Sequence, residues 1–314
     1  MQVHHDIASL PFFKKAVITI GTFDGVHTGH LQIINQLKKE AALVDGESVI
    51  ITFHPHPRKI IFQQHKDNDG KKINDIQVLN TLDERIGLLR NQAIEHLVIV
   101  PFTNEFSEQS AEDYIEKFLV SNFHPHTIIT GYDHHFGKDR KGNYVLLEQF
   151  GEIYNYTVKE IPGHVLNNVA ISSTKIREAL LTGDVDTANK FLGYDYSFSG
   201  IVTEGDRIGR TIGYPTANIP PESMEKLVPA NGVYAVNIKI DSDFYKGMMN
   251  IGVRPTVGGL KKVIEVNIFN FDNDIYGKNI RIYLKKYLRS EQKFNGLNEL
   301  RDQLAKDKLK AEII

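Results

Sequence analysis

The hydrophobic pattern of this 314-residue chain changes character once, near residue 190. In the N-terminal part, short β-branched runs alternate with segments whose apolar residues recur every three or four positions. The former predict buried strands, and the latter predict helices that each cover one face of a sheet. The predicted strands are Ala16–Gly21, Ser48–His54, Leu97–Pro101, Thr127–Gly131 and Tyr156–Ile161; the predicted helices are Leu31–Val44, Leu82–Glu95, Ala111–Asn122 and Ser173–Thr182. This alternation predicts right-handed βαβ crossovers and a doubly wound parallel sheet.

Beyond about Tyr194, strand-like runs follow one another without helices between them. They are separated by Gly, Pro and Asp turns and comprise Phe198–Thr203, Gly232–Ile240, Lys246–Gly252 and Val263–Phe269. Such spacing predicts a small antiparallel β-barrel. Leu repeats at helical spacing in Phe294–Lys306, which predicts a terminal helix packed against that barrel. We therefore expect two domains, residues 1–185 and 186–314, as the length of the chain also suggests.

One segment interrupts the rhythm of the N-terminal part. Lys66–Ile76 is rich in Asp, Asn, Gly and Lys. This composition is typical of a solvated loop. The loop is either a lid or an ordinary insertion.

Charge and composition exclude several classes of protein. Lys and Arg number 37 against 39 Asp and Glu, so the formal charge of -2 gives no overall reason to bind nucleic acid. There are no cysteines, which excludes disulfides and thiolate-bound metals and fits a reducing compartment. No apolar run reaches the roughly 18–20 residues that span a bilayer, and Met1–Pro11 does not resemble a signal peptide. We expect a cytoplasmic protein without membrane or nucleic-acid partners.

A candidate phosphate site follows the first predicted strand. Gly21–His30 reads Gly-Thr-Phe-Asp-Gly-Val-His-Thr-Gly-His and leads into a predicted helix. In open α/β sheets, ligands bind beyond the carboxyl ends of the strands, where helix N-termini direct N–H groups at phosphates. Gly29 would let the backbone approach a triphosphate, and His27 and His30 could donate hydrogen bonds to developing charge. A His-x-Gly-His tetrapeptide alone could equally be a glycine-rich turn with two solvated histidines; its place between strand and helix favours the functional interpretation.

This string resembles the Phe-Asp-Gly-x-His-x-Gly-His signature of bacterial FMN adenylyltransferases, within the nucleotidyltransferase superfamily. Three further stretches agree in order. Thr52–Pro57 matches the family's Phe-x-Pro-His-Pro loop, Gly131–Gly137 resembles its Gly-Asp-Asp/Asn-Phe-x-Phe-Gly turn, and Ile171–Arg177 resembles its Ile-Ser-Ser-Thr-x-Ile-Arg segment. Two positions depart from the pattern: His134 replaces the usual first Phe, and Ala170 stands where many relatives carry Arg.

The resemblance implies a Rossmann-like nucleotidyltransferase domain in which FMN attacks the α-phosphorus of ATP directly. Catalysis would then consist of alignment and charge stabilisation, with His27 and His30 as the catalytic residues. The implied ATP-binding residues are Gly21, Phe23, Asp24, Gly25, His27, Gly29, His30, Ser173, Thr174 and Arg177, and the candidates on the FMN side are His56, Pro57 and Asp133. Lys175 or Arg177 would supply the charge missing at Ala170. Without this context, Ser-Ser-Thr would be an ordinary helix N-cap.

A second glycine-rich string begins the C-terminal domain. Gly200–Arg210 leads to Gly213–Asn218, but the Walker order Gly-x-x-x-x-Gly-Lys-Ser/Thr is missing. By composition alone it could be two β-turns flanking a strand. The complete string resembles the signature of riboflavin kinases, Gly-x-Val-x-x-Gly-x-x-x-Gly-Arg-x-x-Gly-x-Pro-Thr-Ala-Asn, which lies on a six-stranded barrel. Asn231–Ala235, Asn250–Thr256 and Ile264–Asn267 follow in the order of that family.

The second resemblance implies a kinase site. ATP would be bound by Gly205, Gly209, Arg210, Thr216 and Asn218, with Thr216 and Asn218 coordinating Mg²⁺, and Glu265 would accept a proton from the riboflavin hydroxyl. Arg289, Glu291 and Phe294 would bind the flavin; the alternative for these three is a surface charge run with one anchoring Phe. The family commonly has His where this chain has Asn267.

Together the motifs extend from about Ala16 to Ala311, so the chain is identified as a member of the bacterial bifunctional riboflavin kinase/FMN adenylyltransferase (FAD synthetase) family. Its small-molecule partners would be riboflavin, FMN, FAD, ATP, ADP and pyrophosphate. One rival is a tRNA-linked synthetase fragment, which the near-neutral charge and the missing Lys-Met-Ser-Lys-Ser-like loop disfavour. Another is a non-catalytic flavin-binding regulator; only His134 and Ala170, the two departures from the family pattern, favour it.

Overall fold

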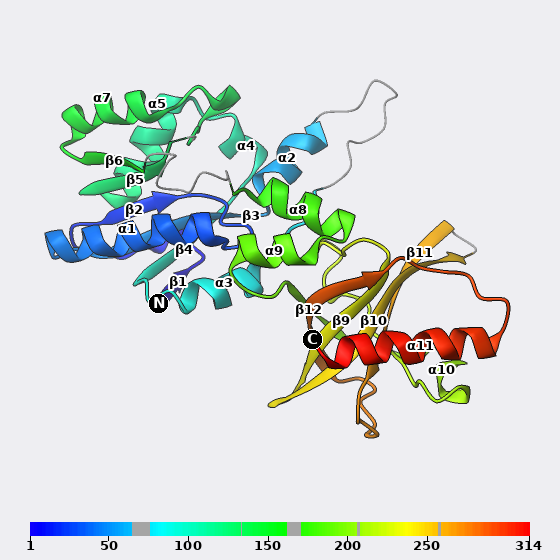
Figure 1. Ribbon diagram of the computed structural model, residues 1–314. Helices are drawn as coiled ribbons and strands as arrows, with labels where there is room; N and C mark the ends of the chain where they lie inside the picture. Colours follow the sequence, from blue (N-terminus) through cyan, green and yellow to red (C-terminus); the bar gives the residue numbers. More distant parts are fainter. Residues whose placement is uncertain (65–75, 133, 162–170, 206–207, 257–258) are drawn as a thin grey trace. The chain divides into compact units, whose positions relative to one another are not determined.

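The computed structural model describes residues 1–64, 76–132, 134–161, 171–205, 208–256 and 259–314. These residues form two compact units, Met1–Ser172 and Ser173–Ile314 (Figure 1). Residues 66–75 of the expected loop Lys66–Ile76 lie outside the described residues. Within those residues, no helix is both long and apolar enough to cross a membrane.

The first unit is built on a six-stranded sheet in the order β1-β4-β3-β2-β5-β6, in which every pair of neighbours is parallel. Its strands are β1 (Gln2–His4), β2 (Val17–Ile20), β3 (Ser48–His54), β4 (His96–Pro101), β5 (Thr127–Gly131) and β6 (Thr157–Ile161). Strands β2 to β6 agree with the predicted runs to within one residue at either end. The short edge strand β1 was not predicted.

Helices cover both faces of this sheet, which confirms the predicted doubly wound fold. Alternate strand residues point to opposite faces. On one face, Ile34 and Leu37 of α1 pack with Val17 and Ile50; on the other, Phe118 belongs to a separate core. In Figure 1, α1 and α3 lie on one side of the sheet and α5 and α7 on the other.

The helices of the first unit are η1 (Ile7–Ser9), α1 (Thr28–Val44), α2 (Pro57–Gln64), α3 (Leu82–Arg90), α4 (Asn104–Ser107), α5 (Ala111–Asp113), η2 (Tyr114–Val120), α6 (Ser121–Phe123), η3 (Lys138–Arg140) and α7 (Tyr144–Tyr154). The predicted helix Leu82–Glu95 ends at Arg90, because the chain turns there towards β4. The predicted helix Ala111–Asn122 is one run of α5, η2 and α6. Helices α2, α4 and α7 were not predicted.

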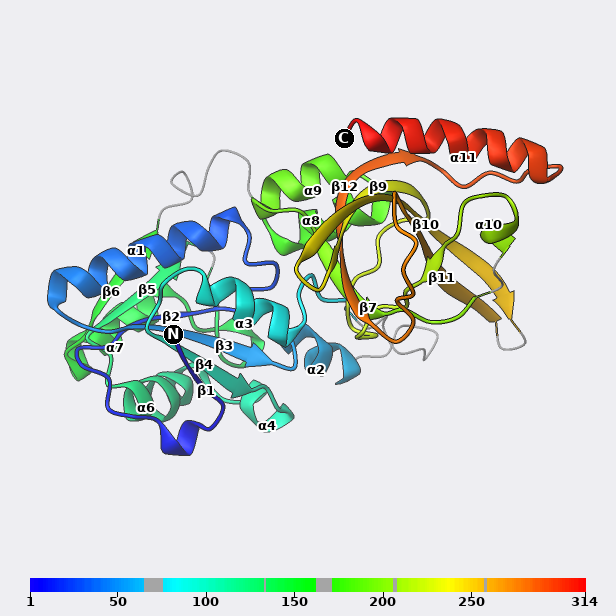
Figure 2. The ribbon, with the colours of Figure 1, turned by 90° about the horizontal axis from the view of Figure 1, so that it is seen from below.

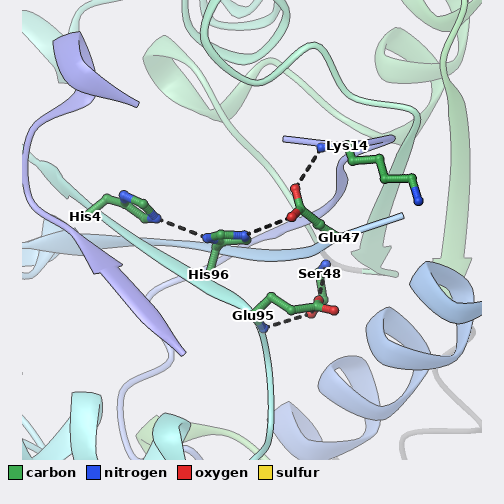
Figure 3. A network of polar contacts seen from close by, with 6 residues as sticks. All are labelled: His4, Lys14, Glu47, Ser48, Glu95 and His96. Atoms are coloured by element: carbon green, nitrogen blue, oxygen red, sulfur yellow. Dashed lines mark hydrogen bonds and ion pairs between the residues drawn. The ribbon is translucent and has the colours of Figure 1, made fainter. Parts of the chain in front are cut away.

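A polar network joins His4, at the end of β1, to the amino ends of β3 and β4 (Figure 3). His4 Nε2 lies 3.1 Å from His96 Nδ1, and His96 Nε2 lies 3.6 Å from Glu47 Oε1. Glu47 Oε2 in turn accepts a hydrogen bond of 2.7 Å from the backbone N–H of Lys14. Burial and the nearby His96 lower the pKa of His4. This network ties β1 to β4 and to the residue before β3, and the carboxyl ends of the strands are left for the motif loops.

The second unit is a six-stranded antiparallel sheet in the order β7-β12-β9-β10-β11-β8. Its strands are β7 (Ser197–Ile201), β8 (Ala217–Asn218), β9 (Gly232–Ile240), β10 (Asp243–Thr256), β11 (Gly259–Ile268) and β12 (Asn279–Arg289). Thr203, just beyond β7, pairs with Asn218 of β8, and its N–H donates to the Asn218 carbonyl at 2.8 Å. This bridge joins the two edges of the sheet, so the predicted barrel is confirmed (Figure 2).

Four helices of the described chain accompany the barrel: α8 (Ser173–Thr182), α9 (Val185–Leu192), α10 (Ile208–Thr211) and α11 (Leu297–Glu312). Asn189 of α9 donates to the Leu284 carbonyl of β12 at 2.8 Å. Ala311 of α11 packs in one core with Ala235 and Met248. The predicted C-terminal helix is therefore confirmed, although it begins later and ends later than Phe294–Lys306. Strand β12 was not predicted, although its buried Ile280, Ile282 and Leu284 alternate with less buried residues.

Candidate active sites

The loop between β2 and α1 has an unusual backbone. Phe23 and Val26 have φ angles of 48° and 35°, and Gly25 between them has a φ of 90°. Positive φ in residues other than glycine costs about 1–3 kcal/mol each and persists only where the surroundings enforce it. Both Phe23 and Val26 are buried, so packing helps to hold this conformation. Backbone strain at the carboxyl edge of the sheet supports the loop as a candidate site.

His27 and His30 lie together at the start of α1. His27 is the N-cap, and its Nδ1 accepts a hydrogen bond of 3.3 Å from the backbone N–H of His30. The two rings stack with centroids 3.6 Å apart and planes 15° from parallel. A Cβ atom on Gly29 would lie 3.2 Å from two atoms of the His27 ring, so the glycine leaves space for this imidazole. Because Nδ1 of His27 accepts this bond, Nε2 is the ring nitrogen that remains to face a ligand.

The imidazole of His30 is held in its neutral form. Burial lowers its pKa well below 6.5, and the charges of His27 and Arg85 lower this pKa further. Its Nδ1 is buried and has no hydrogen-bond partner in the described part of the chain. His30 therefore has a polar atom that a ligand or a water molecule could engage.

Asp24 anchors the loop from inside the protein. Its Oδ1 accepts hydrogen bonds from the backbone N–H groups of Leu79 at 2.9 Å and Asn80 at 3.1 Å. The side chain is buried. These bonds tie the motif loop to the segment that precedes α3.

Arg85 of α3 contacts the same loop and was not identified from the sequence. Its Nη1 donates to the Thr22 carbonyl and, at 3.0 Å, to Thr52 Oγ1. Thr52 Oγ1 itself donates to the Thr22 carbonyl at 3.1 Å. Arg85 is buried and lies on the apolar stripe of its helix, four residues before buried Leu89. A charged residue at a core-facing helix position was the available signal, since charged side chains are rarely buried without a partner.

The other predicted residues of the adenylyl site lie in three places. His56 is buried directly before α2, with its Nδ1 accepting from Arg58 N–H at 3.2 Å, and Pro57 is the first residue of α2. The Ile171 carbonyl lies 3.8 Å from the Cβ position of Gly29, so the Ile-Ser-Ser-Thr segment begins beside the His-x-Gly-His turn. Helix α8, in the second unit, carries Ser173, Thr174 and Arg177. Asp133 and Ala170 lie outside the described residues.

In the barrel, a polar row crosses three strands. Glu265 of β11 pairs directly with Asn218 of β8 on one side and with Asn250 of β10 on the other. Directly opposed residues of antiparallel strands project on the same face, with Cβ atoms about 4.5–5.5 Å apart. The candidate base Glu265 and the candidate metal ligand Asn218 are therefore neighbours. Arg254 Nη2 also donates to Glu265 Oε1 at 2.9 Å, an ion pair that the sequence did not predict.

Close contacts shape the glycine-rich turn beside this row. A Cβ atom on Gly205 would lie 1.9 Å from Asn218 Nδ2, and one on Gly209 would lie 2.2 Å from the Tyr214 carbonyl. Asn267 Nδ2 donates to the Pro215 carbonyl at 2.6 Å. The residue that replaces the family's usual His thus holds the Pro-Thr-Ala-Asn turn. Thr216 in that turn and Arg210 in α10 are exposed.

The three predicted flavin residues differ in their surroundings. Arg289 Nη2 lies 2.7 Å from Oδ2 of fully buried Asp307 in α11, and its guanidinium lies 5.9 Å from the centre of the Phe294 ring. Glu291 instead reaches the polar row, because a Cβ on Gly252 would lie 2.2 Å from Glu291 Oε1 and 3.3 Å from Asn250 Nδ2. Arg289 therefore holds α11 against the barrel, and Glu291 is the predicted flavin residue beside the row.

The donors near Glu265 bear on metal binding. Among the described residues, no group of three or more His, Asp or Glu side chains could hold a metal ion. The hydroxyl of Thr216 and the amide oxygen of Asn218 are hard oxygen donors of the kind that supplement nucleotide phosphates around a small divalent cation. The resemblance of both motif strings to those of ATP-dependent transferases also suggests that a divalent metal is required.

Comparison with known proteins finds a family for each part of the chain. Residues 10–175 match the family model described as FAD synthetase, and residues 192–314 match the model described as riboflavin kinase. The chain is 38% identical over 301 residues to a bifunctional riboflavin kinase/FMN adenylyltransferase of Buchnera aphidicola subsp. Schizaphis graminum, covering 94% of this chain and 92% of that protein. It is 35% identical over 302 residues to the protein of that name from Bacillus subtilis, covering 95% and 92%.

The fold also matches a solved structure. A crystal structure described as a macrolide-efflux protein from Streptococcus pneumoniae superimposes with a TM-score of 0.86 and 29% identity, covering 99% of this chain and 98% of that one. The likeness therefore extends over both units.

Fold and sites together define a two-domain ATP-dependent transferase, with a nucleotidyltransferase unit followed by a barrel kinase unit. The chain belongs to the bifunctional riboflavin kinase/FMN adenylyltransferase family, as the two family models and the full-length relatives show. It is an enzyme of flavin cofactor synthesis whose substrates are small molecules. This assignment favours the bifunctional enzyme over a tRNA-linked synthetase fragment.

Proposed function

We propose that the polar row of the barrel phosphorylates riboflavin to FMN and that the loop before α1 adenylylates FMN to FAD. The cross-strand register of Glu265 and Asn218 carries the first assignment, because it brings a carboxylate base and an amide oxygen donor onto one face. Glu265 takes the proton from the riboflavin hydroxyl that attacks the γ-phosphate of ATP. ADP is the second product.

Thr216 and Asn218 would hold Mg²⁺, an ion that proteins commonly bind through one or two oxygen ligands together with the phosphates of ATP. When bound, it would offset the negative charge of those phosphates. Gly205, Gly209 and Arg210 bind the ATP together with these two residues. Glu291 contacts the flavin, as do Arg289 and Phe294 in the resemblance to the family. The contact of Gly205 with Asn218 supports this arrangement, since any larger residue at 205 would displace the amide.

In the first unit, the FMN phosphate attacks the α-phosphorus of ATP and pyrophosphate leaves. The N-terminus of α1 directs the positive end of its dipole at the nucleotide, and His27 and His30 stabilise the charge that develops. Gly21, Phe23, Asp24, Gly25 and Gly29 shape this loop around ATP. By the resemblance to the family, Ser173, Thr174 and Arg177 bind the ATP phosphates. Lys175 is the other candidate for the positive charge that relatives carry at the position of Ala170. His56, Pro57 and Asp133 bind FMN.

We further propose a domain boundary between residues 185 and 186 and a cytoplasmic location. The two family models support a boundary in this region, since one ends at residue 175 and the other begins at 192. A fragment from Asp186 to Ile314 that folds but makes no FMN would contradict the boundary or the kinase assignment.

The direct test is to incubate the full-length protein with ATP and Mg²⁺ and to separate the flavins by chromatography. Riboflavin should yield FMN and then FAD, and FMN supplied alone should yield FAD. A folded protein that binds flavin but forms neither product would instead be a flavin-binding regulator.

A further inference from the structure

The motif loop before α1 depends on contacts that come from outside it. Phe23 and Val26 both have positive φ, and such conformations relax unless other groups restrain them. The groups of the loop that are restrained from outside include the carboxylate of Asp24 and the carbonyl of Thr22. Both are held through the region around α3, by the N–H groups of residues 79–80 and by Arg85. The start of α3 therefore supplies part of the support of the strained turn.

Burying the charged side chain of Arg85 costs free energy of folding. It is buried, and burial lowers the pKa of its guanidinium, an effect that the nearby carboxylate of Asp24 opposes. Its Nε has no hydrogen-bond partner among the residues that the structure describes. A buried charge with an unsatisfied donor is destabilising unless its other contacts compensate. Those contacts are Thr22 and Thr52, which lie 63 and 33 residues away in the sequence.

We infer that Arg85 is a positioning residue for adenylyl transfer: it fixes the Thr22 carbonyl and thereby the strained turn that delivers His27 and His30 to the start of α1. This inference rests on the proposed assignment of adenylyl transfer to that loop.

Arg85 joins three elements of the first unit at one point. One nitrogen, Nη1, reaches the Thr22 carbonyl and Thr52 Oγ1 at once, so the end of β3, the loop after β2 and α3 are joined at one point. The Thr22 carbonyl belongs to the peptide bond that leads directly into Phe23, the first residue of this loop with positive φ. An apolar side chain at 85 would remove the Arg85 hydrogen bond to that carbonyl and keep the one from Thr52 Oγ1.

The test compares Arg85→Met, Arg85→Lys and Arg90→Met in the full-length enzyme. Arg90 is exposed on the same helix and serves as the matched control. Arg85→Met should lower kcat for FAD formation from FMN about 10- to 100-fold, because small displacements of aligned groups have effects of this size. Its KM values should change far less, riboflavin phosphorylation should be unchanged, and Arg85→Lys should restore part of the loss. Normal FAD formation by Arg85→Met overturns the inference.

Two further variants separate the possible failures. His30→Ala should suppress FAD formation on the order of 100- to 1000-fold. If it does not, the proposed function of the loop is wrong; if it does and Arg85→Met remains active, only the role of Arg85 is wrong. Should Arg85→Met fail to fold, Thr52→Val replaces it, since this change removes the hydroxyl that joins Arg85 to Thr22. Loss of FAD formation with intact kinase activity supports the inference, and full activity contradicts it.

Discussion

Arg254 Nη2 donates a hydrogen bond of 2.9 Å to Glu265 Oε1 across strands β10 and β11. Both side chains are partly exposed, so the pair contributes at most about 1 kcal/mol to the free energy of unfolding. Its effect is on geometry: Arg254 holds one carboxylate oxygen, and in the proposed mechanism the other oxygen meets the riboflavin hydroxyl. The proposed base is thus oriented before the substrate binds.

Replacing Arg254 should therefore affect catalysis more than stability. Arg254→Met is expected to lower kcat for FMN formation about 10-fold, because the carboxylate loses its fixed orientation. FAD formation from FMN and the unfolding midpoint should stay unchanged. Exposed Arg301 on α11 offers a control, Arg301→Met. A kcat for FMN formation equal to that of the wild type would show that the ion pair has no catalytic role.

Glu265→Gln tests the base itself. The change preserves size and hydrogen bonding but removes the proton acceptor, and loss of a general base typically costs about 100- to 10,000-fold. We expect kcat for riboflavin phosphorylation to fall far more than KM rises. Supplying FMN bypasses the defect, so steady-state assays should find FAD formation at the wild-type rate. Normal phosphorylation of riboflavin would remove Glu265 from the mechanism.

Asp307 should contribute mainly to the stability of the barrel. It is fully buried and accepts hydrogen bonds from Arg289 Nε and Nη2. Removing one partner of a buried pair leaves the other charge uncompensated, at a cost of about 3–5 kcal/mol. Asp307→Ala should accordingly lower the free energy of unfolding of the barrel in urea titrations. Exposed Asp302 on the same helix gives the control Asp302→Ala, and equal midpoints for the two variants would contradict the structural role of the ion pair.

His30 of the first unit makes the stability of the protein depend on pH. Burial first, and then His27 and Arg85, depress the pKa of His30 in the folded protein below its ordinary 6.5. Below pH 6.5 the unfolded chain therefore binds a proton at this residue that the folded protein does not bind. The stabilisation is fully present above pH 6.5 and is lost progressively as the pH falls towards the folded-state pKa.

Urea unfolding of the first unit at several pH values measures this effect. The free energy of unfolding of the wild type should fall between pH 7 and pH 5, and His30→Asn should show a shallower decrease. His4 contributes in the same direction, since burial also lowers its pKa. Identical slopes for wild type and His30→Asn would exclude His30 as a source of the dependence.

Local patterns in the sequence were sufficient to predict much of the fold. The predicted runs Ser48–His54 and Thr127–Gly131 coincide with β3 and β5, because a buried parallel strand needs an uninterrupted apolar run that is visible without its neighbours. The motif strings likewise located the loop before α1 and the Pro-Thr-Ala-Asn turn. Strand β1 is three residues long and therefore carried too little periodicity to be recognised.

The contacts that support the sites were decided by the tertiary structure. Arg85 lies in an ordinary-looking helix, and its partners Thr22 and Thr52 belong to other strands and loops. The register of Glu265 against Asn218 depends on how β8 joins the barrel, 47 residues away along the chain. Single-sequence periodicity reports which face a residue occupies, but it does not report which residue lies opposite. That information arises only when the chain closes long loops and packs its elements together.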